Sequence, residues 1–204
     1  MKTAFFLFLI LIFWQEQSFA QQKTYINHTE IGPMFGRVKV SENNFDPRIN
    51  FSFQTFNGAR INKYHAVGFL IGLDTYPNFN LIPMAFAWRG FWEKGKRSTP
   101  FAGLDLGKGS AILEKREVNE WGENWYEGGF LFSPSIGIRR KGKNGKNDFT
   151  WSLGFKRQQA FFYEGFRDFT NSNNAGTGLP PGFSSVREEA YIFNSISIKW
   201  GLVF

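Results

Sequence analysis

Apolar and polar residues alternate with a period of two through most of the chain after its first twenty residues. Between His65 and Thr75, the even-numbered positions are mostly small or polar and the odd-numbered positions are apolar: Val67, Phe69, Ile71 and Leu73 oppose Ala66, Gly68, Gly72 and Asp74. Strict alternation of this kind predicts a strand with two different faces. The pattern returns in five later stretches and, more weakly, in two earlier ones, with apolar faces at Ile82–Trp92, Ala102–Leu106, Phe130–Ile138, Phe149–Phe155, Ile192–Phe204, Ile31–Phe35 and Ile49–Phe53.

The strand count is eight, and an even number allows antiparallel closure. We therefore predict an all-β fold, an eight-stranded antiparallel up-and-down transmembrane β-barrel. The interior of such a barrel is just wide enough for side chains to fill, so the Gly, Ala and Ser face is expected inside and the aromatic face outside, against lipid. The alternative is a soluble lipocalin-like barrel or sandwich with the rings inside. Its difficulty is volume, because 26 Phe and 7 Trp would overfill one small core.

Three prolines interrupt the predicted strands. Pro33, Pro83 and Pro134 are all expected on the apolar face. A central strand resists proline because the residue has no N–H to donate, so local bulges are the expected accommodation.

The first twenty residues have the features of an export signal. Lys2 supplies positive charge, Ala4–Trp14 is an unbroken apolar run, and Ser18 and Ala20 put small residues where a signal peptidase reads them. The run is too short for a spanning helix, which needs about 20 apolar residues; the alternative is a buried N-terminal helix. We expect residues 1–20 to be a cleaved signal peptide and residues 21–204 to form one domain. The chain has no Cys, which excludes disulfides and a lipid-anchored form.

Connection lengths predict how the barrel is oriented. The turns expected at one end are Asn57–Asn62, Glu93–Thr99 and Arg140–Asp148, and the loops expected at the other are Lys39–Pro47, Gly109–Glu127 and Glu164–Glu189. The short connection Tyr76–Asn78 departs from this pattern. Because outer-membrane barrels have short periplasmic turns and longer extracellular loops, both termini are expected on the periplasmic side. An aromatic girdle is then predicted at that interface, formed by Trp92, Trp151 and Trp200.

Seven charged residues fall on the face expected to line the lumen. They are Glu30, Asp74, Arg89, Asp105, Arg139, Lys156 and Lys199. One interpretation is a path for ions or small solutes. The favoured interpretation is a buried salt-bridge network that fills the barrel, because each inward charge is costly without a partner. Most of these residues are therefore expected to be paired.

Candidate catalytic chemistry is sparse. The chain has two histidines, His28 in the expected N-terminal lead-in and His65 at the periplasmic start of a strand. An enzyme that modifies membrane lipid needs a His beside a Ser and a carboxylate at the outer rim, and His65 is at the wrong end. There is no clustered His pair to hold a metal. We predict no catalytic residues, no metal site and no cofactor.

Basic residues crowd the expected periplasmic turns and help to set the net charge of +7. One group is Lys94, Lys96 and Arg97, and the other is Arg139, Arg140, Lys141, Lys143 and Lys146. Export argues against a nucleic-acid partner. The remaining interpretations are contact with anionic lipid headgroups or cell-wall polymer, and simple solvated turns.

The long loops are the expected place for contacts with other molecules. Trp121 and Trp125 lie four residues apart in an acidic loop that holds Glu114, Glu117, Glu120 and Glu123. These two side chains either anchor an extracellular partner or pack over the barrel mouth. The sequence does not identify such a partner.

Taken together, these segments resemble the small outer-membrane β-barrel proteins of the OmpA/OmpX type. The resemblance lies in AVGFLIGLDTY (66–76), LIPMAFAWRGFWEKGKRSTPFAGLDLGKG (81–109), GGFLFSPSIGIRRKGK (128–143) and the closing SISIKWGLVF (195–204). It covers nearly the whole chain after the signal peptide. Trp200 and Phe204 resemble the C-terminal aromatic signal that the barrel-assembly machinery reads in such proteins.

The resemblance implies a location and partners. The expected location is the cell outer membrane of a Gram-negative-type bacterium, and the expected partners are outer-membrane lipids, lipopolysaccharide and, during biogenesis, the assembly machinery. The leading hypothesis is a structural or surface-interaction barrel without catalysis. The alternatives are a narrow channel for ions or small solutes and a lipid-modifying outer-membrane enzyme.

Overall fold

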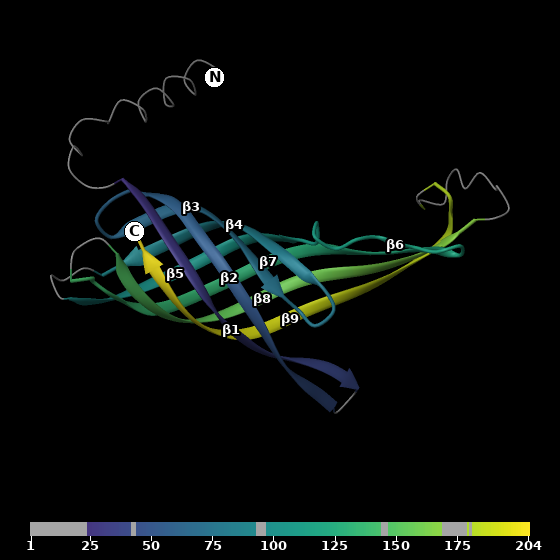
Figure 1. The fold of residues 1–204 in the computed structure, drawn as a ribbon, viewed down its shortest axis with the longest axis horizontal. Coiled ribbons are helices and arrows are strands. Elements are labelled where there is room, and N and C mark those ends of the chain that lie inside the picture. The colour runs from purple at the N-terminus through teal and green to yellow at the C-terminus, as the bar shows by residue number, and fades with distance from the viewer. Residues whose placement is uncertain (1–23, 42–43, 93–96, 144–146, 169–178, 180) are drawn as a thin grey trace, which may run out of the picture.

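A closed ring of antiparallel strands forms the body of the molecule in the computed structural model (Figure 1). The structure describes residues 24–41, 44–92, 97–143, 147–168, 179 and 181–204. Eight long strands make the ring, each paired with its neighbours in the chain: β1 (Tyr25–Ser41), β2 (Asn44–Arg60), β3 (His65–Thr75), β4 (Asn80–Phe91), β5 (Ser98–Ser110), β7 (Gly122–Arg140), β8 (Asp148–Arg167) and β9 (Phe183–Val203). The two-residue strand β6 (Glu117–Val118) lies outside the ring and pairs only with β7. The eight-stranded up-and-down barrel predicted from alternation is confirmed.

The ring closes where the first and last strands meet. Antiparallel pairs from His28–Val203 to Gly36–Ser195 join β1 to β9. Beyond the His28–Val203 pair, the Phe204 N–H donates to the Asn27 carbonyl at 2.9 Å. The start of β1 and the end of β9 therefore lie together at one end of the barrel, as Figure 1 shows.

The two faces of each strand have the orientation that alternation predicts. On β3, Phe69 is 62% exposed, whereas the next residue, Leu70, is 2% exposed. Each of the eight long strands carries large apolar side chains on the outside of the ring, among them Phe35, Phe53, Ile71, Phe86, Leu106, Ile136, Leu153 and Ile198. Large apolar side chains therefore cover the outer wall, while a second set of rings, including Phe56, Phe79, Phe91, Phe101 and Phe193, packs inside the lumen. The outer wall is not the polar surface that a soluble lipocalin-like barrel presents.

Each of the three prolines is accommodated without a bulge, contrary to expectation. The register is unchanged on both sides of the missing pairs, which run from Ile31–Trp200 to Met34–Ser197, from Ile71–Met84 to Asp74–Leu81, and from Phe132–Arg157 to Ser135–Gly154. Each gap spans one proline, which has no N–H to donate, so the ladder loses bonds locally and keeps its alignment. Pro83 was also assigned to the wrong face: it is buried between Leu81 and Ala85 on the inward side.

A genuine bulge occurs in β7 instead. The register shifts between Gly128 and Leu131. The buried Gln158 side chain on β8 donates to the carbonyl of Gly129 at 3.0 Å. Since a bulge leaves backbone groups outside the ladder, this amide supplies a partner that the opposite strand does not.

Several predicted loops are partly strand. At the end of the barrel opposite the termini, β7, β8 and β9 continue past the ring as a projecting sheet (Figure 1). Trp125 pairs with Tyr163, and Tyr163 pairs with Glu188. The segments predicted as the loops Gly109–Glu127 and Glu164–Glu189 therefore contain strand at both ends. The segment Lys39–Pro47 is likewise strand on either side of residues 42–43.

The lumen is packed with side chains in three zones. One buried apolar cluster contains Ile26, Phe56, Leu70, Phe91, Phe101 and Val203, and a second contains Met34, Tyr76, Phe79, Leu81, Ala160 and Phe193. Along the inward face of β1, Ile26 is followed by His28, Glu30, Gly32 and then Met34, so polar residues separate the two clusters. The inward face of β9 repeats this order from Val203 through Lys199 to Phe193.

No helix in the described part of the chain is long and apolar enough to span a membrane. The predicted signal peptide, residues 1–20, lies outside the described residues.

Candidate functional site

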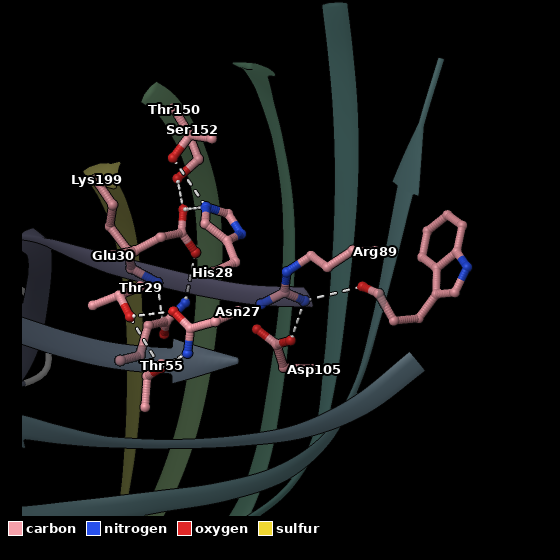
Figure 2. A network of polar contacts seen from close by, with 12 residues as sticks. Asn27, His28, Thr29, Glu30, Thr55, Arg89, Asp105, Thr150, Ser152 and Lys199 are labelled. Atoms are coloured by element: carbon pink, nitrogen blue, oxygen red, sulfur yellow. Dashed lines mark hydrogen bonds and ion pairs between the residues drawn. The ribbon is translucent and has the colours of Figure 1, made fainter. Parts of the chain in front are cut away.

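The barrel interior holds all seven charged residues predicted to line it. Glu30, Asp74, Arg89, Asp105, Arg139, Lys156 and Lys199 are each 7% exposed or less. These side chains point inward because each lies an even number of positions from the small residues on the inner face of its strand. All of them except Arg139 come from the middle zone between the apolar clusters, where several strands contribute polar groups. Figure 2 shows the network around Glu30, Arg89, Asp105 and Lys199.

Arg89 and Asp105 form one centre of this network. They lie on the neighbouring strands β4 and β5, and Arg89 Nη1 is 2.5 Å from Asp105 Oδ1. Arg89 also places its guanidinium 5.0 Å from the centre of the Phe56 ring. The cation is therefore paired on one side and lies against Phe56 of the first apolar cluster on the other. A weakly hydrated guanidinium tolerates this apolar contact.

Glu30 forms a second centre, on β1. Its carboxylate accepts from Ser152 Oγ at 2.6 Å and from Gln54 Nε2 at 3.0 Å. Gln54 in turn accepts from Lys199 Nζ at 3.0 Å. A chain of polar contacts thus links four strands, and Lys199 reaches the carboxylate through a neutral amide. Gln54 and Ser152 were not singled out from the sequence as members of the network.

His28 completes this centre and corrects a prediction. The sequence places it in a lead-in before the barrel, whereas the structure places it inside β1 with 0% exposure. Its Nε2 lies 2.9 Å from Thr150 Oγ1 and 3.6 Å from Glu30 Oε1 (Figure 2). The Phe101 ring packs edge-on against the imidazole at 5.4 Å between centroids.

Lys156 and Asp74 form an ion pair across the lumen. Their strands, β8 and β3, are four steps apart whichever way the ring is followed. Asp74 is 0% exposed and Lys156 is 1% exposed. This pair therefore ties opposite walls of the barrel together directly below the second apolar cluster, in which Tyr76 and Phe193 pack at 4.5 Å between ring centroids.

Arg139 lies at the other end of the lumen, close to the termini. Its Nε donates to Asp148 Oδ2 at 2.7 Å, and its guanidinium lies 5.0 Å from the centre of the Phe91 ring. Asp148 also accepts from the Gly142 N–H at 3.1 Å. The sequence suggested Asp148 only as the limit of a turn; in the structure it fixes that turn and neutralises a buried cation.

Aromatic residues close the opposite end of the lumen, which we call the mouth. Phe79 stacks on Tyr126 at 4.9 Å and on Tyr76 at 5.2 Å between centroids. The hairpin between β3 and β4 is short because the Tyr76 N–H donates to the Phe79 carbonyl at 2.9 Å. The segment after β5 folds onto this layer: Glu114 accepts from the Asn80 N–H at 2.6 Å, and Ala111 joins the apolar cluster.

The two tryptophans predicted for extracellular contacts have different surroundings. Trp121 is 70% exposed. Trp125 stacks on Tyr163 at 5.2 Å and receives the Arg116 guanidinium 5.0 Å from its ring. Since the next residue, Tyr126, turns into the mouth, Trp125 lies on the opposite face of the projecting sheet. The two rings are not brought together over the lumen.

The predicted girdle residues lie on the outer wall at the end where the termini lie. Trp92, Trp151 and Trp200 are 49%, 63% and 48% exposed, and the Trp151 and Trp200 rings are 6.2 Å apart. Phe204, 47% exposed, follows β9 directly. His65, at the same end, stacks on Trp88 at 5.7 Å.

Among the described residues, no group of three or more His, Cys, Asp or Glu is placed to hold a metal ion. The described residues do bring a His, a Ser and a carboxylate together in His28, Ser152 and Glu30. The Ser152 hydroxyl donates to Glu30 and not to His28, and all three side chains are buried. This arrangement gives no activated nucleophile at a surface that a substrate can reach.

Comparison with solved structures finds distant likenesses, of which two are described here. One is to the crystal structure of Neisserial surface protein A, with 11% sequence identity, a TM-score of 0.45, and coverage of 88% of this chain and 94% of that chain. The other is to the solid-state NMR structure of outer membrane protein AlkL in lipid bilayers, with 10% identity, a TM-score of 0.38 and 94% coverage of each chain. No family model matches the chain, and no curated protein matches it. Likenesses this low carry nothing about activity.

Proposed function

We propose that this protein is an outer-membrane β-barrel of the small OmpA/OmpX type, with a structural or surface-interaction role and no catalysis. The observation that carries the proposal is the outward apolar face on every strand of a closed ring. A soluble protein rarely exposes so much contiguous apolar surface, whereas a barrel in lipid requires it all the way round.

The distribution of charge supports the same placement. On the outer wall of β3, the run Val67, Phe69, Ile71 and Leu73 contains no charged residue. The ionised groups of the middle zone face inward and find partners there. Among the charged side chains on the outer face of the ring, Arg37, Lys108 and Arg157 lie toward the mouth, and Arg140 lies toward the end that holds the termini. Charges on the lipid face are destabilising, and most so at the bilayer midplane.

The packing of the lumen favours a barrel that does not conduct. Phe91 and Phe101 fill the end of the lumen near the termini, Phe79 and Phe193 fill the mouth, and paired charges occupy the space between. A pore needs a continuous water column, whereas packed rings occupy both ends of this lumen. The channel alternative therefore has less support than the structural role.

The projecting sheet of β7, β8 and β9 is the proposed surface for extracellular contacts. It presents exposed apolar side chains at its far end, including Trp121 and Phe166, and its charged residues form ion pairs such as Arg187 with Glu189 at 2.5 Å. Binding residues commonly sit on extensions held by a rigid scaffold, and the barrel supplies that scaffold.

Cell fractionation combined with a heat-modifiability gel tests the proposal. We expect the mature protein in the outer-membrane fraction, with a band that shifts between unheated and boiled samples because a closed barrel resists SDS until it is heated. A protein recovered in the soluble periplasmic fraction without such a shift would contradict the proposal. A mass change of lipid A that depends on the gene would revive the enzyme alternative.

A further inference from the structure

A basic hollow lies on the outer wall at the end of the barrel that holds the termini. It has a volume of about 770 Å³ and is lined by Arg97, Arg140, Lys141, Lys143, Phe149 and Trp151, together with Gly142 and Asn147. Four of these residues are cations, and the lining includes no carboxylate. A volume of this size is in the range of sites that take small ligands.

The hollow combines two kinds of surface. Arg140 continues the outward face of β7 that carries Ile136 and Ile138, so its side chain is at the edge of the apolar wall. It pairs in register with Phe149 on β8, and Phe149 and Trp151 are 57% and 63% exposed. Cations therefore lie at the rim and exposed rings lie directly beside them on the wall.

The backbone around the hollow is fixed by contacts of its own. The Lys141 N–H donates to the Arg97 carbonyl at 2.8 Å, which joins the turn after β7 to the segment before β5. Asp148 holds the Gly142 N–H, and a Cβ on Gly142 would lie 2.1 Å from the Asn147 carbonyl oxygen. The backbone at Lys141 and Gly142 is therefore held next to Arg97 and Asp148, which keeps these parts of the lining side by side.

We infer that this hollow binds the phosphate headgroup of an anionic glycerophospholipid in the adjacent membrane leaflet, with the acyl chains lying along Phe149 and Trp151. The inference rests on the proposed membrane location. Phosphate is recognised by clustered Arg and Lys donors, and exposed rings at a membrane interface suit the acyl-chain boundary. A free anion would not contact the exposed rings of Phe149 and Trp151, and a cell-wall polymer has no acyl chain that could pack against them.

Native mass spectrometry of the refolded mature protein tests this inference. The probes are dioleoyl phosphatidylglycerol and dioleoyl phosphatidylcholine, supplied at equal concentration. We expect wild-type barrel to retain the anionic lipid about tenfold more strongly, and the variant R97Q/R140Q/K141Q/K143Q to lose that preference, because each interfacial cation contributes to anionic-lipid attraction. The matched control K115Q/R116Q/R167Q/R187Q removes four cations at the opposite end and should keep it.

Several outcomes would overturn the inference. They are the absence of a headgroup preference in wild type, an equal loss in the control variant, displacement of the lipid by an equal concentration of inorganic phosphate, and binding of soluble cell-wall fragments in place of the lipid. The heat-modifiability shift is recorded for every variant, and R97Q/K143Q replaces the quadruple variant if that one does not fold. A folded, membrane-extracted barrel without lipid preference refutes only the lipid site, whereas absence of the shift and of membrane association refutes the proposed function.

Discussion

Lys156 on β8 and Asp74 on β3 form an ion pair between opposite walls of the barrel, and both side chains are buried. A buried pair of this kind contributes little when intact, because the cost of removing both charges from water offsets their attraction. Breaking it is costly, since one charge is left without a partner in the lumen.

Changing only Asp74 to Asn is therefore expected to lower the free energy of unfolding by about 3–5 kcal/mol. The double variant D74N/K156M should recover much of that loss, because it leaves no unpaired charge. Urea unfolding of the barrel from lipid vesicles, followed by tryptophan fluorescence, measures both values. Strictly additive effects of D74N and K156M would show that the two groups do not depend on each other.

Conductance distinguishes a filled barrel from a pore. Wild-type protein in a planar bilayer is expected to give no stepwise current, because Phe91 and Phe101 close one end of the lumen and Phe79 and Phe193 close the other. The variant F79A/F193A should also give no current, since the charged layer and the cluster around Phe91 and Phe101 stay in place. Regular current steps from refolded wild-type protein would favour the channel alternative.

Gly32 permits close approach at the seam where β1 meets β9. A Cβ at this position would lie 2.0 Å from the Ile198 carbonyl oxygen, so Gly32→Ala forces the two strands apart. We expect it to cost about 1–3 kcal/mol, as overpacking does, and to reduce the fraction of heat-modifiable protein. Gly36→Ala is the control on the same face: its Cβ would first meet the Ser195 hydroxyl, at 2.8 Å. Equal behaviour of the two variants would contradict this account of the seam.

A charge on the outer wall tests where the lipid lies. Ile71, 49% exposed on β3, faces lipid in this account, whereas Ile112, 77% exposed, follows β5 at the mouth. Ile71→Arg is expected to destabilise the barrel in vesicles by about 2–4 kcal/mol, and Ile112→Arg by far less. The same unfolding assay compares them. A similar small effect at both positions would place Ile71 in water.

The barrel itself is predictable from sequence because each strand has an apolar outer face and a small or polar inner face, which gives a period of two. Along β3, the outward positions from Val67 to Leu73 are all apolar, and the polar residues His65 and Thr75 at either side mark where the strand is bounded. The same parity predicts which charged residues point inward. It does not predict which of them form pairs, because Lys156 meets Asp74 only after ring closure brings β8 opposite β3.

The start of β1 was missed for a physical reason. Its outward positions are polar: Asn27 Nδ2 donates to Thr55 Oγ1 at 2.9 Å and to Asn57 Oδ1 at 2.8 Å. Thr29 joins the same ladder (Figure 2). With hydrogen-bonded polar residues outside and Ile26 inside, the apolar signal is inverted, and His28 was placed outside the barrel.

The projecting sheet was missed because aromatic residues occupy both of its faces. Trp125 and Tyr126 are adjacent yet pack on opposite sides, against Tyr163 and Phe79 respectively. The run Phe161, Phe162 and Tyr163 also shows no alternation. Beyond the closed ring, neither face of the sheet has to be uniformly apolar, so the period of two disappears while the strands continue.

Single-cysteine spin labelling along β3 tests most directly which way the side chains point. The chain has no native Cys, so each label is unique. For labels at positions 67 to 73 in vesicles, collision with lipid-soluble oxygen should be high at 67, 69, 71 and 73 and low at 68, 70 and 72. The reverse period, or strong collision of the odd positions with a water-soluble nickel chelate, would contradict a barrel whose apolar side chains face lipid.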